Sequence, residues 1–174
     1  PFVRRLRRRV ARLSGALLTA AVLVPAVASA TTLVVDDDGT YDAGTSTCDG
    51  ADASFPTING AHVATVDGDT IFVCPGTYVE IQVNITKAIT LQGSGAATTI
   101  IDGGGGTGLT NAGTLRIRTN TGNVTVDGFT IQGAAAQGAL ATGLRFAISA
   151  KSSAAVTYTI TNNVIKGNNN PAWG

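Results

Sequence analysis

The sequence contains no methionine, only one histidine and only two cysteines among its 174 residues. A tetrahedral zinc site needs more ligands than His62, Cys48 and Cys74 can supply. The Gly-x-Ser-x-Gly pattern of a nucleophile elbow is absent, so a Ser-His-Asp triad has no support. The glycine-rich run at 103–108 lacks the Lys-Ser/Thr pair of a phosphate-binding loop. These absences exclude the commonest metal, hydrolase and nucleotide sites.

The chain is also poor in charge, with 13% charged residues, and leucine is sparse beyond residue 30. Long amphipathic helices are therefore not expected. Valine, isoleucine and threonine are frequent, and 22 glycines interrupt them. β-Branched residues in short runs that end at glycine or asparagine favour many short strands. The composition predicts an all-β protein with about one domain beyond the N-terminal segment.

Residues 1–30 have the pattern of a secretory signal peptide. Six arginines precede residue 13, residues 13–27 are apolar, and Ala28-Ser29-Ala30 supplies small residues for cleavage. The apolar run is shorter than a bilayer span, so no membrane span is expected after cleavage. We therefore expect a secreted protein, extracellular or at the cell surface. The chain does not start with methionine, and we expect it to be a fragment that is also truncated at its C-terminus.

Removal of residues 1–30 leaves six basic residues against 11 acidic ones, a net charge of −5. The basic isoelectric point of the whole chain therefore comes from the arginines of the first segment. No basic patch of the size that binds nucleic acid remains, so a nucleic-acid partner is not expected.

Residues 31–54 are expected to form one strand, at 31–35, followed by a polar loop. Cys48 lies in that loop and Cys74 lies 26 residues further on. In an oxidising compartment the pair predicts a disulfide, which would contribute about 3 kcal/mol in the chain-entropy model. Two buried free thiols are the alternative.

Aspartates cluster after the first expected strand, in the stretch LVVDDDGTYD. Asp36, Asp38 and Asp42 are candidate calcium ligands, and calcium is the one cofactor that the sequence suggests. An EF-hand loop needs wider spacing and a glutamate six residues after its glycine, where this chain has Thr45. A solvated turn is the favoured interpretation.

A short helix is predicted at about 57–66. Ile58, Ala61 and Ala64 recur at the spacing of one helical face. Thr57 is the expected N-cap and Gly68 the expected C-terminal stop. Gly60 weakens such a helix by about 1 kcal/mol, so packing must hold it in place.

Beyond residue 68 the chain repeats short apolar runs that end in glycine or asparagine. The stretches VDGFTIQGA and ITNNVIKGN align without gaps at an offset of 34 residues. Repeats of this length indicate stacked units that bury a continuous aliphatic core. A parallel β-helix over 55–174 is predicted, with asparagine ladders between its coils, and an antiparallel sandwich is the alternative.

Residues 55–95 resemble the N-terminal part of secreted right-handed β-helix proteins of the pectin-lyase-like superfamily. The resemblance lies in the stretches GDTI (68–71) and PGTY (75–78), in Glu80, and in the ITLQGSG that follows. It implies a right-handed solenoid whose open end is capped by the short helix. Enzymes and non-enzymes share this start, so the resemblance implies the fold more strongly than any activity.

Members of this superfamily include pectate lyases, which use calcium and an arginine base. The resemblance makes Asp102, Asp127, Arg116 and Arg118 catalytic candidates, since the two arginines alternate on one strand and both aspartates end strands. Together they could hold an acidic sugar, although an ordinary polar strand face is the favoured interpretation. Pectin methylesterases are also similar here, and Gln137 could take the place of their glutamine. Their catalytic aspartate motifs are not matched.

The sequence thus favours an exported β-helix that interacts with carbohydrate, either a polysaccharide or a cell-surface glycan, or that serves as a surface scaffold. A polysaccharide lyase, glycoside hydrolase or pectinesterase is the alternative. A cluster of carboxylates with arginine or glutamine in one groove would favour the enzyme.

Overall fold

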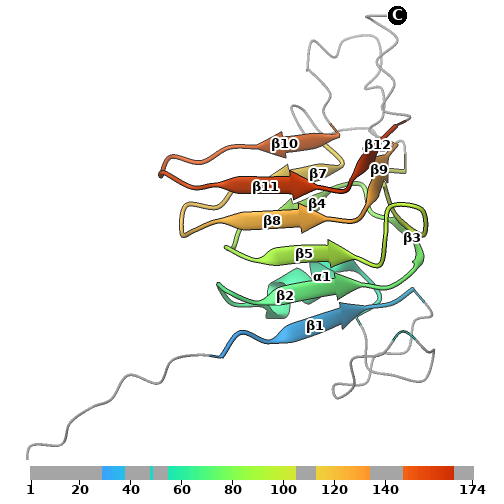
Figure 1. Ribbon diagram of the computed structural model, residues 1–174, viewed down its shortest axis with the longest axis horizontal. Coiled ribbons are helices and arrows are strands. Elements are labelled where there is room, and N and C mark those ends of the chain that lie inside the picture. Colours follow the sequence, from blue (N-terminus) through green and yellow to red (C-terminus); the bar gives the residue numbers. More distant parts are fainter. Residues whose placement is uncertain (1–28, 38–47, 49–54, 105–112, 134–146, 167–174) are drawn as a thin grey trace, which may run out of the picture.

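We describe a computed structural model of the chain, covering residues 29–37, 48, 55–104, 113–133 and 147–166. Its strands form three parallel sheets, which we name A, B and C. Each sheet contains strands that lie far apart in the sequence, because each coil of the chain adds one strand to every sheet. This arrangement is a parallel β-helix, as the sequence predicts (Figure 1).

Sheet A has the strand order β1-β2-β5-β8-β11 and sheet B the order β12-β9-β6-β3. The strands of sheet A are β1 (Thr32–Val35), β2 (Thr70–Val73), β5 (Thr90–Gly93), β8 (Val124–Asp127) and β11 (Tyr158–Thr161). Those of sheet B are β3 (Gly76–Val79), β6 (Thr99–Asp102), β9 (Thr130–Gln132) and β12 (Val164–Ile165). Sheet C has the order β10-β7-β4, with β4 (Val83–Ile85), β7 (Leu115–Ile117) and β10 (Ile148–Ala150).

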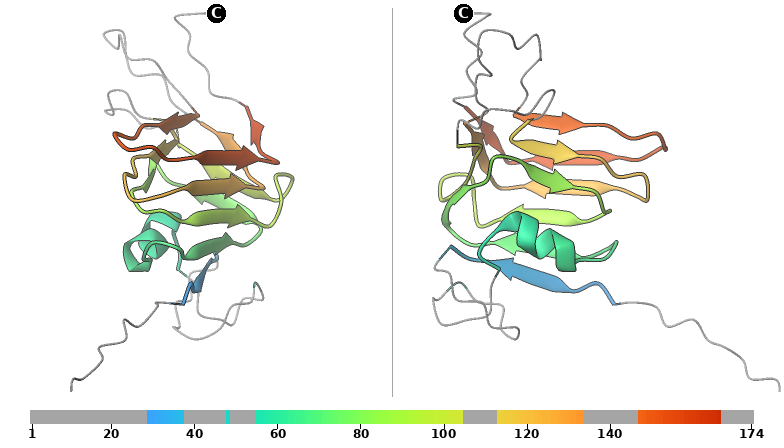
Figure 2. Two further views of the ribbon diagram at one scale, coloured as in Figure 1. Left: turned by 60° about the vertical axis from the view of Figure 1, so that its left-hand side comes forward. Right: turned by 180° about the vertical axis from the view of Figure 1, so that it is seen from behind.

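The coil is right-handed. In Figure 1 the strands of sheet A run from left to right across the front, while β7 and β10 run from right to left behind them. The chain climbs from β1 at the bottom to β11 near the top as it turns. The view from behind in Figure 2 brings sheet C and the helix to the front. This hand is the one that parallel crossovers adopt almost without exception.

Alternating side chains build the core. In β8, Val124 and Val126 are buried and the residues between and after them are half-buried. Inward residues stack in columns, because each strand pairs in register with the one below: Ile71 opposes Leu91, and Leu91 opposes Val126. These three side chains are fully buried. No single coil could shield them, so the coils are stable only as a stack.

The register confirms the repeat that the sequence displays. Val126 pairs with Ile160 and Thr130 with Val164, each 34 residues apart. The turn between the paired strands needs a positive φ at equivalent positions, which Gly128 (φ 80°) and Asn162 (φ 53°) supply. Asparagine adopts this conformation more readily than most residues, so the exchange is tolerated.

The predicted helix is α1 (Ile58–Ala64), and it lies next to β4 at the lower end of the solenoid. Thr57 is its N-cap, as predicted, and accepts the Gly60 N–H at 3.1 Å. The prediction of Gly68 as the stop is wrong, since the helix ends at Ala64. Lys87 Nζ donates to the carbonyl oxygens of His62, Val63 and Thr65, so these carbonyls need no glycine cap.

The lower edge of β1 is also covered. Phe55 forms a parallel bridge to Val35, donates its N–H to Val34 O and accepts the Asp36 N–H. Cys48 and Cys74 form the predicted disulfide, which ties the loop after β1 to the end of β2. Residues 1–28, which carry most of the expected signal peptide, lie outside the described part of the chain. Within the described residues, no helix has the length and apolar character that crossing a bilayer requires.

Candidate functional site

The four residues suggested as catalytic candidates lie on three different sheets. Asp127 ends β8 in sheet A, and Asp102 ends β6 in sheet B. Arg116 lies in β7 of sheet C, and Arg118 follows the same strand. Gln137 lies outside the described residues. The structure therefore does not bring the aspartates and arginines into one groove, and the expected convergence of these four side chains is wrong.

Both aspartates fasten one coil to the next. Asp127 Oδ1 accepts hydrogen bonds from Thr161 Oγ1 at 2.8 Å and Asn162 Nδ2 at 2.7 Å. Asp102 accepts Gln132 Nε2 at 2.9 Å and the Gly104 N–H at 2.8 Å. These contacts join turns and neighbouring strands, so both carboxylates have structural roles.

The arginines share the outer face of sheet C, as their alternation predicts. Arg116 NH1 donates to Asn84 Oδ1 at 3.1 Å on the strand below. Arg118 NH1 donates to the carbonyl oxygens of Ile117 and Ser149, and its NH2 donates to Ser149 Oγ at 3.0 Å. Arg118 is thus held against β10 on the coil above.

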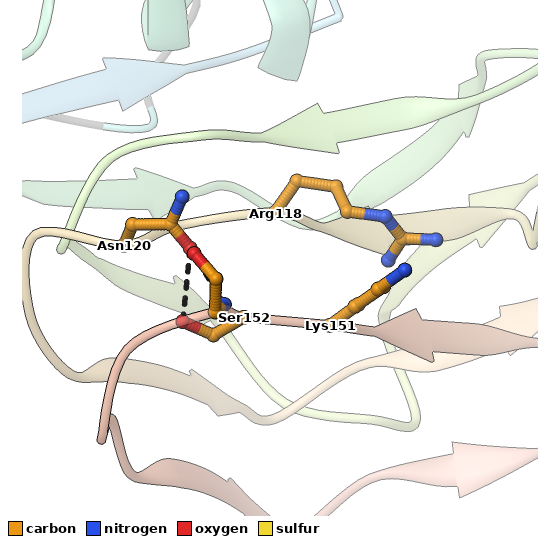
Figure 3. Close-up of a pocket in the computed structure, with 5 residues that line it drawn as sticks. Arg118, Asn120, Lys151 and Ser152 are labelled. Carbon is orange, nitrogen blue, oxygen red and sulfur yellow. Dashed lines mark hydrogen bonds between the residues drawn. The ribbon is translucent and has the colours of Figure 1, made fainter.

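A shallow pocket of about 300 Å³ opens beside Arg118. It is lined by Arg118, Asn120, Lys151, Ser152 and Ser153. Figure 3 shows the Arg118 and Lys151 side chains running in the same direction, with their charged ends adjacent. Asn120 Oδ1 accepts Ser152 Oγ at 3.0 Å and the Ser153 N–H at 3.0 Å, which leaves the Asn120 amide N–H groups as donors.

The pocket therefore has an excess of positive charge and of hydrogen-bond donors. Three of the five guanidinium N–H groups are used by the bonds to Ile117 and Ser149, so Nε–H and one NH2 hydrogen remain. Lys151 Nζ has no hydrogen-bond partner among the described residues. No carboxylate lines the pocket. Adjacent unneutralised cations repel each other, and an anion placed between them would relieve this repulsion.

Lys151 was not among the residues singled out from the sequence. Ala150 pairs with Ile117, so the next residues, Lys151 and Arg118, lie above one another on consecutive coils. The sequence does carry a signal, because LRIR (115–118) and ISAK (148–151) both end in a basic residue at an offset of 33. Only the register shows that this offset stacks the two cations.

The residues behind the family resemblance hold the helical cap. The Tyr78 hydroxyl donates to Cys74 O at 3.0 Å and reaches Val35 O at 3.3 Å. A Cβ atom on Gly76 would lie 2.7 Å from Asp37 Oδ2, so no side chain fits there without movement. The Gly-x-Tyr-x-Glu pattern here ties the first coil together and does not line a ligand site.

Glu80, the last residue of that pattern, binds the first turn of α1. Its two oxygens accept the Ile58 N–H at 2.6 Å and the Asn59 N–H at 3.1 Å. Burial raises the pKa of the Glu80 carboxyl, and the hydrogen bonds from Asn59 and Ile58 oppose that rise. Glu80 therefore supplies two acceptors for N–H groups that a helix start leaves without intrahelical partners.

His62 lies inside the cap, as a cap-interface residue. It is 6% exposed, and its Nε2 accepts the Thr86 N–H at 2.9 Å. Burial lowers the pKa of His62, and the nearby Lys87 ammonium lowers it further. The imidazole is therefore neutral in the folded protein at neutral pH, with Nε2 as acceptor.

This arrangement predicts a loss of stability in mild acid. Unfolded His62 takes up a proton near its ordinary pKa of about 6.5, and the folded form resists it, so the unfolded state binds more protons below that pH. We expect the free energy of unfolding to fall as the pH drops from about 6.5 towards the lowered folded pKa. Urea unfolding at several pH values, compared with His62→Gln, checks this. Equal pH dependence in both proteins would contradict it.

The calcium candidates are only partly described. Asp36 is buried next to the disulfide, and its carboxylate lies within 4.8 Å of the Cys48 and Cys74 sulfurs. Those sulfurs are bonded to each other and are not available as thiolate ligands. Asp38 and Asp42 lie outside the described residues, so calcium binding by the three aspartates stays a prediction.

No protein-family model matches the chain, and comparison with curated proteins finds no significant match.

Proposed function

We propose that this protein is an exported β-helix scaffold that binds acidic polysaccharides on the outer face of sheet C without cleaving them. The observation that carries the proposal is the Arg118–Lys151 pair, whose charges no described carboxylate neutralises. A uronate carboxylate in the pocket would accept hydrogen bonds from Lys151 Nζ and from the remaining Arg118 donors. Such charge-assisted bonds are stronger than bonds between neutral groups.

The distribution of charge supports this choice of face. Four of the six basic residues beyond residue 30 lie on sheet C or in the turns after its strands: Lys87, Arg116, Arg118 and Lys151. No aspartate or glutamate lies in β4, β7 or β10. A chain of net charge −5 beyond residue 30 thus presents one cationic surface. The coils stack at about 4.8 Å, so consecutive coils can contact an extended polymer.

Export and family are part of the same proposal. The arginine-rich, apolar and small-residue pattern of residues 1–30 supports export, and so does the Cys48–Cys74 disulfide. The motifs of residues 55–95 support a relationship to the pectin-lyase-like superfamily. The dispersal of Asp102, Asp127 and the arginines over three sheets favours binding over lyase chemistry.

The test is the affinity of the full chain for polygalacturonate, measured by calorimetry, with methyl-esterified pectin as the uncharged comparator. Lys151→Gln should weaken binding of polygalacturonate about tenfold, because a hydrogen bond to a charged group contributes about 1.5–3 kcal/mol. Lys166→Gln, which removes the same charge beyond sheet B, is the matched control and should leave the affinity unchanged. Binding should also weaken as salt is added.

Two results would overturn the proposal. Equal affinity for the acidic and the esterified polymer would show that charge does not select the ligand. Formation of unsaturated products or release of methanol by the full chain would show an enzyme, and would make the lyase or esterase alternative the correct one.

A further inference from the structure

Asn59 and Gly60 form the only Asn-Gly pair in the sequence, and they lie in the first turn of α1. This pair is the most reactive context for asparagine deamidation, since the glycine has no side chain to shield its nitrogen. That nitrogen attacks the asparagine side-chain carbon, ammonia leaves, and water opens the resulting succinimide to aspartate or isoaspartate. No reactant other than water is needed.

The structure explains why glycine occupies position 60. A Cβ atom there would lie 2.8 Å from Thr57 Oγ1, the hydroxyl that caps the helix, and 3.8 Å from Phe55 Cδ1. Glycine costs helix stability, so its presence in a seven-residue helix is otherwise unfavourable. The tight cap and the reactive pair therefore have one origin.

The folded cap restrains both reacting groups. The Gly60 N–H donates to Thr57 Oγ1 at 3.1 Å. Asn59 Nδ2 donates to Gln82 O at 2.7 Å, and Asn59 Oδ1 accepts the Asn84 N–H at 2.9 Å. The side chain is thus fixed at both ends to the segment around β4, and the nitrogen that would attack is held in the helix. Ring closure requires both restraints to be released.

We propose that Asn59–Gly60 is a deamidation site that opens to reaction only when α1 leaves the solenoid, and that the reaction then prevents the cap from closing. In aspartate, a carboxylate oxygen replaces the amide that donates to Gln82 O, so two acceptors oppose each other. That carboxylate would also lie near Glu80, which already binds the Asn59 N–H. Isoaspartate adds a backbone carbon and breaks the helical hydrogen-bond pattern. Each product therefore records a past opening of the cap.

The test follows deamidation of the full chain by peptide mass spectrometry at mildly alkaline pH, in buffer and in denaturing urea. We expect the folded chain to react at least about tenfold more slowly than the unfolded chain, because the reaction needs local opening. Lys87→Ala removes the donor to three carbonyls at the helix end, and should accelerate deamidation of the folded protein about tenfold. Lys151→Ala, a lysine remote from the cap, is the matched control and should have no effect.

A second measurement does not depend on the Lys87 variant. Asn59→Asp mimics one product, and should unfold at a lower urea concentration than the unsubstituted chain. The proposal is overturned if the folded and unfolded chains deamidate at equal rates, if Lys87→Ala does not accelerate the reaction, or if Asn59→Asp is as stable as the unsubstituted chain.

Discussion

Replacing Phe129 with alanine should lower the free energy of unfolding by about 3–5 kcal/mol, the usual cost of truncating a buried aromatic side chain. Phe129 lies at the turn between β8 and β9 and is fully buried. Its ring packs where the coil below carries Gly93, since a Cβ atom on Gly93 would lie 3.0 Å from Phe129 Cε1. No neighbouring side chain is placed to fill the space that alanine would leave.

Equilibrium unfolding in urea measures this loss. Phe129→Leu, which keeps most of the volume, should cost less than about 1.5 kcal/mol. Val79→Ala is the surface control, because Val79 is 67% exposed on sheet B, and its effect should be within about 0.5 kcal/mol of zero. An alanine variant at Phe129 no less stable than the Val79 control would show that this corner is not packed as described.

Asp69→Ala should cost about 2–4 kcal/mol, because it leaves donors of three groups without their acceptor. Asp69 is 2% exposed. Its Oδ1 accepts the Thr31 N–H at 2.8 Å and the Thr31 hydroxyl at 2.9 Å, and Oδ2 accepts the Val66 N–H at 2.7 Å. One carboxylate thus joins the start of β1, the exit of α1 and the start of β2.

The charge of Asp69 gives this prediction a pH dependence. Burial raises the pKa of the carboxyl, but the bonds from Val66 and Thr31 outweigh it, with help from Lys87, and the net pKa is lowered. The contribution of Asp69 is therefore present above its unfolded pKa and is lost as the pH falls through the lower folded value. Asp69→Asn isolates this charge, and the stability difference from the unsubstituted chain should shrink at strongly acidic pH. A difference that is constant with pH would contradict the assignment.

Local features were predictable from the sequence, because neighbouring residues decide them. The Thr57 cap depends on a hydroxyl three residues before an N–H, and the 34-residue offset is a direct copy of one turn of the coil. Gly68 shows the limit of such reasoning. A glycine after a helical pattern predicts the stop, yet Lys87, 22 residues or more from the carbonyls it binds, ends the helix earlier.

The candidate site was predictable only in part. Arg116 and Arg118 share one face because strand side chains alternate, and this follows from the sequence alone. Their separation from Asp102 and Asp127 does not, because strands that end at similar points of the repeat can belong to different sheets. Lys151 was missed for the same reason, since its proximity to Arg118 depends on the pairing of β10 with β7.

The sequence by itself determined that this chain forms stacked parallel coils, with a short helix and one disulfide, because apolar alternation, turn residues and cysteine context act locally. Only the tertiary structure decided which polar residues are fastened to other coils and which are left for a ligand. Asp69, Glu80, Asp102 and Asp127 are all used within the solenoid. The adjacent ends of Arg118 and Lys151 are not, because register brings two cations together where no described carboxylate can reach them.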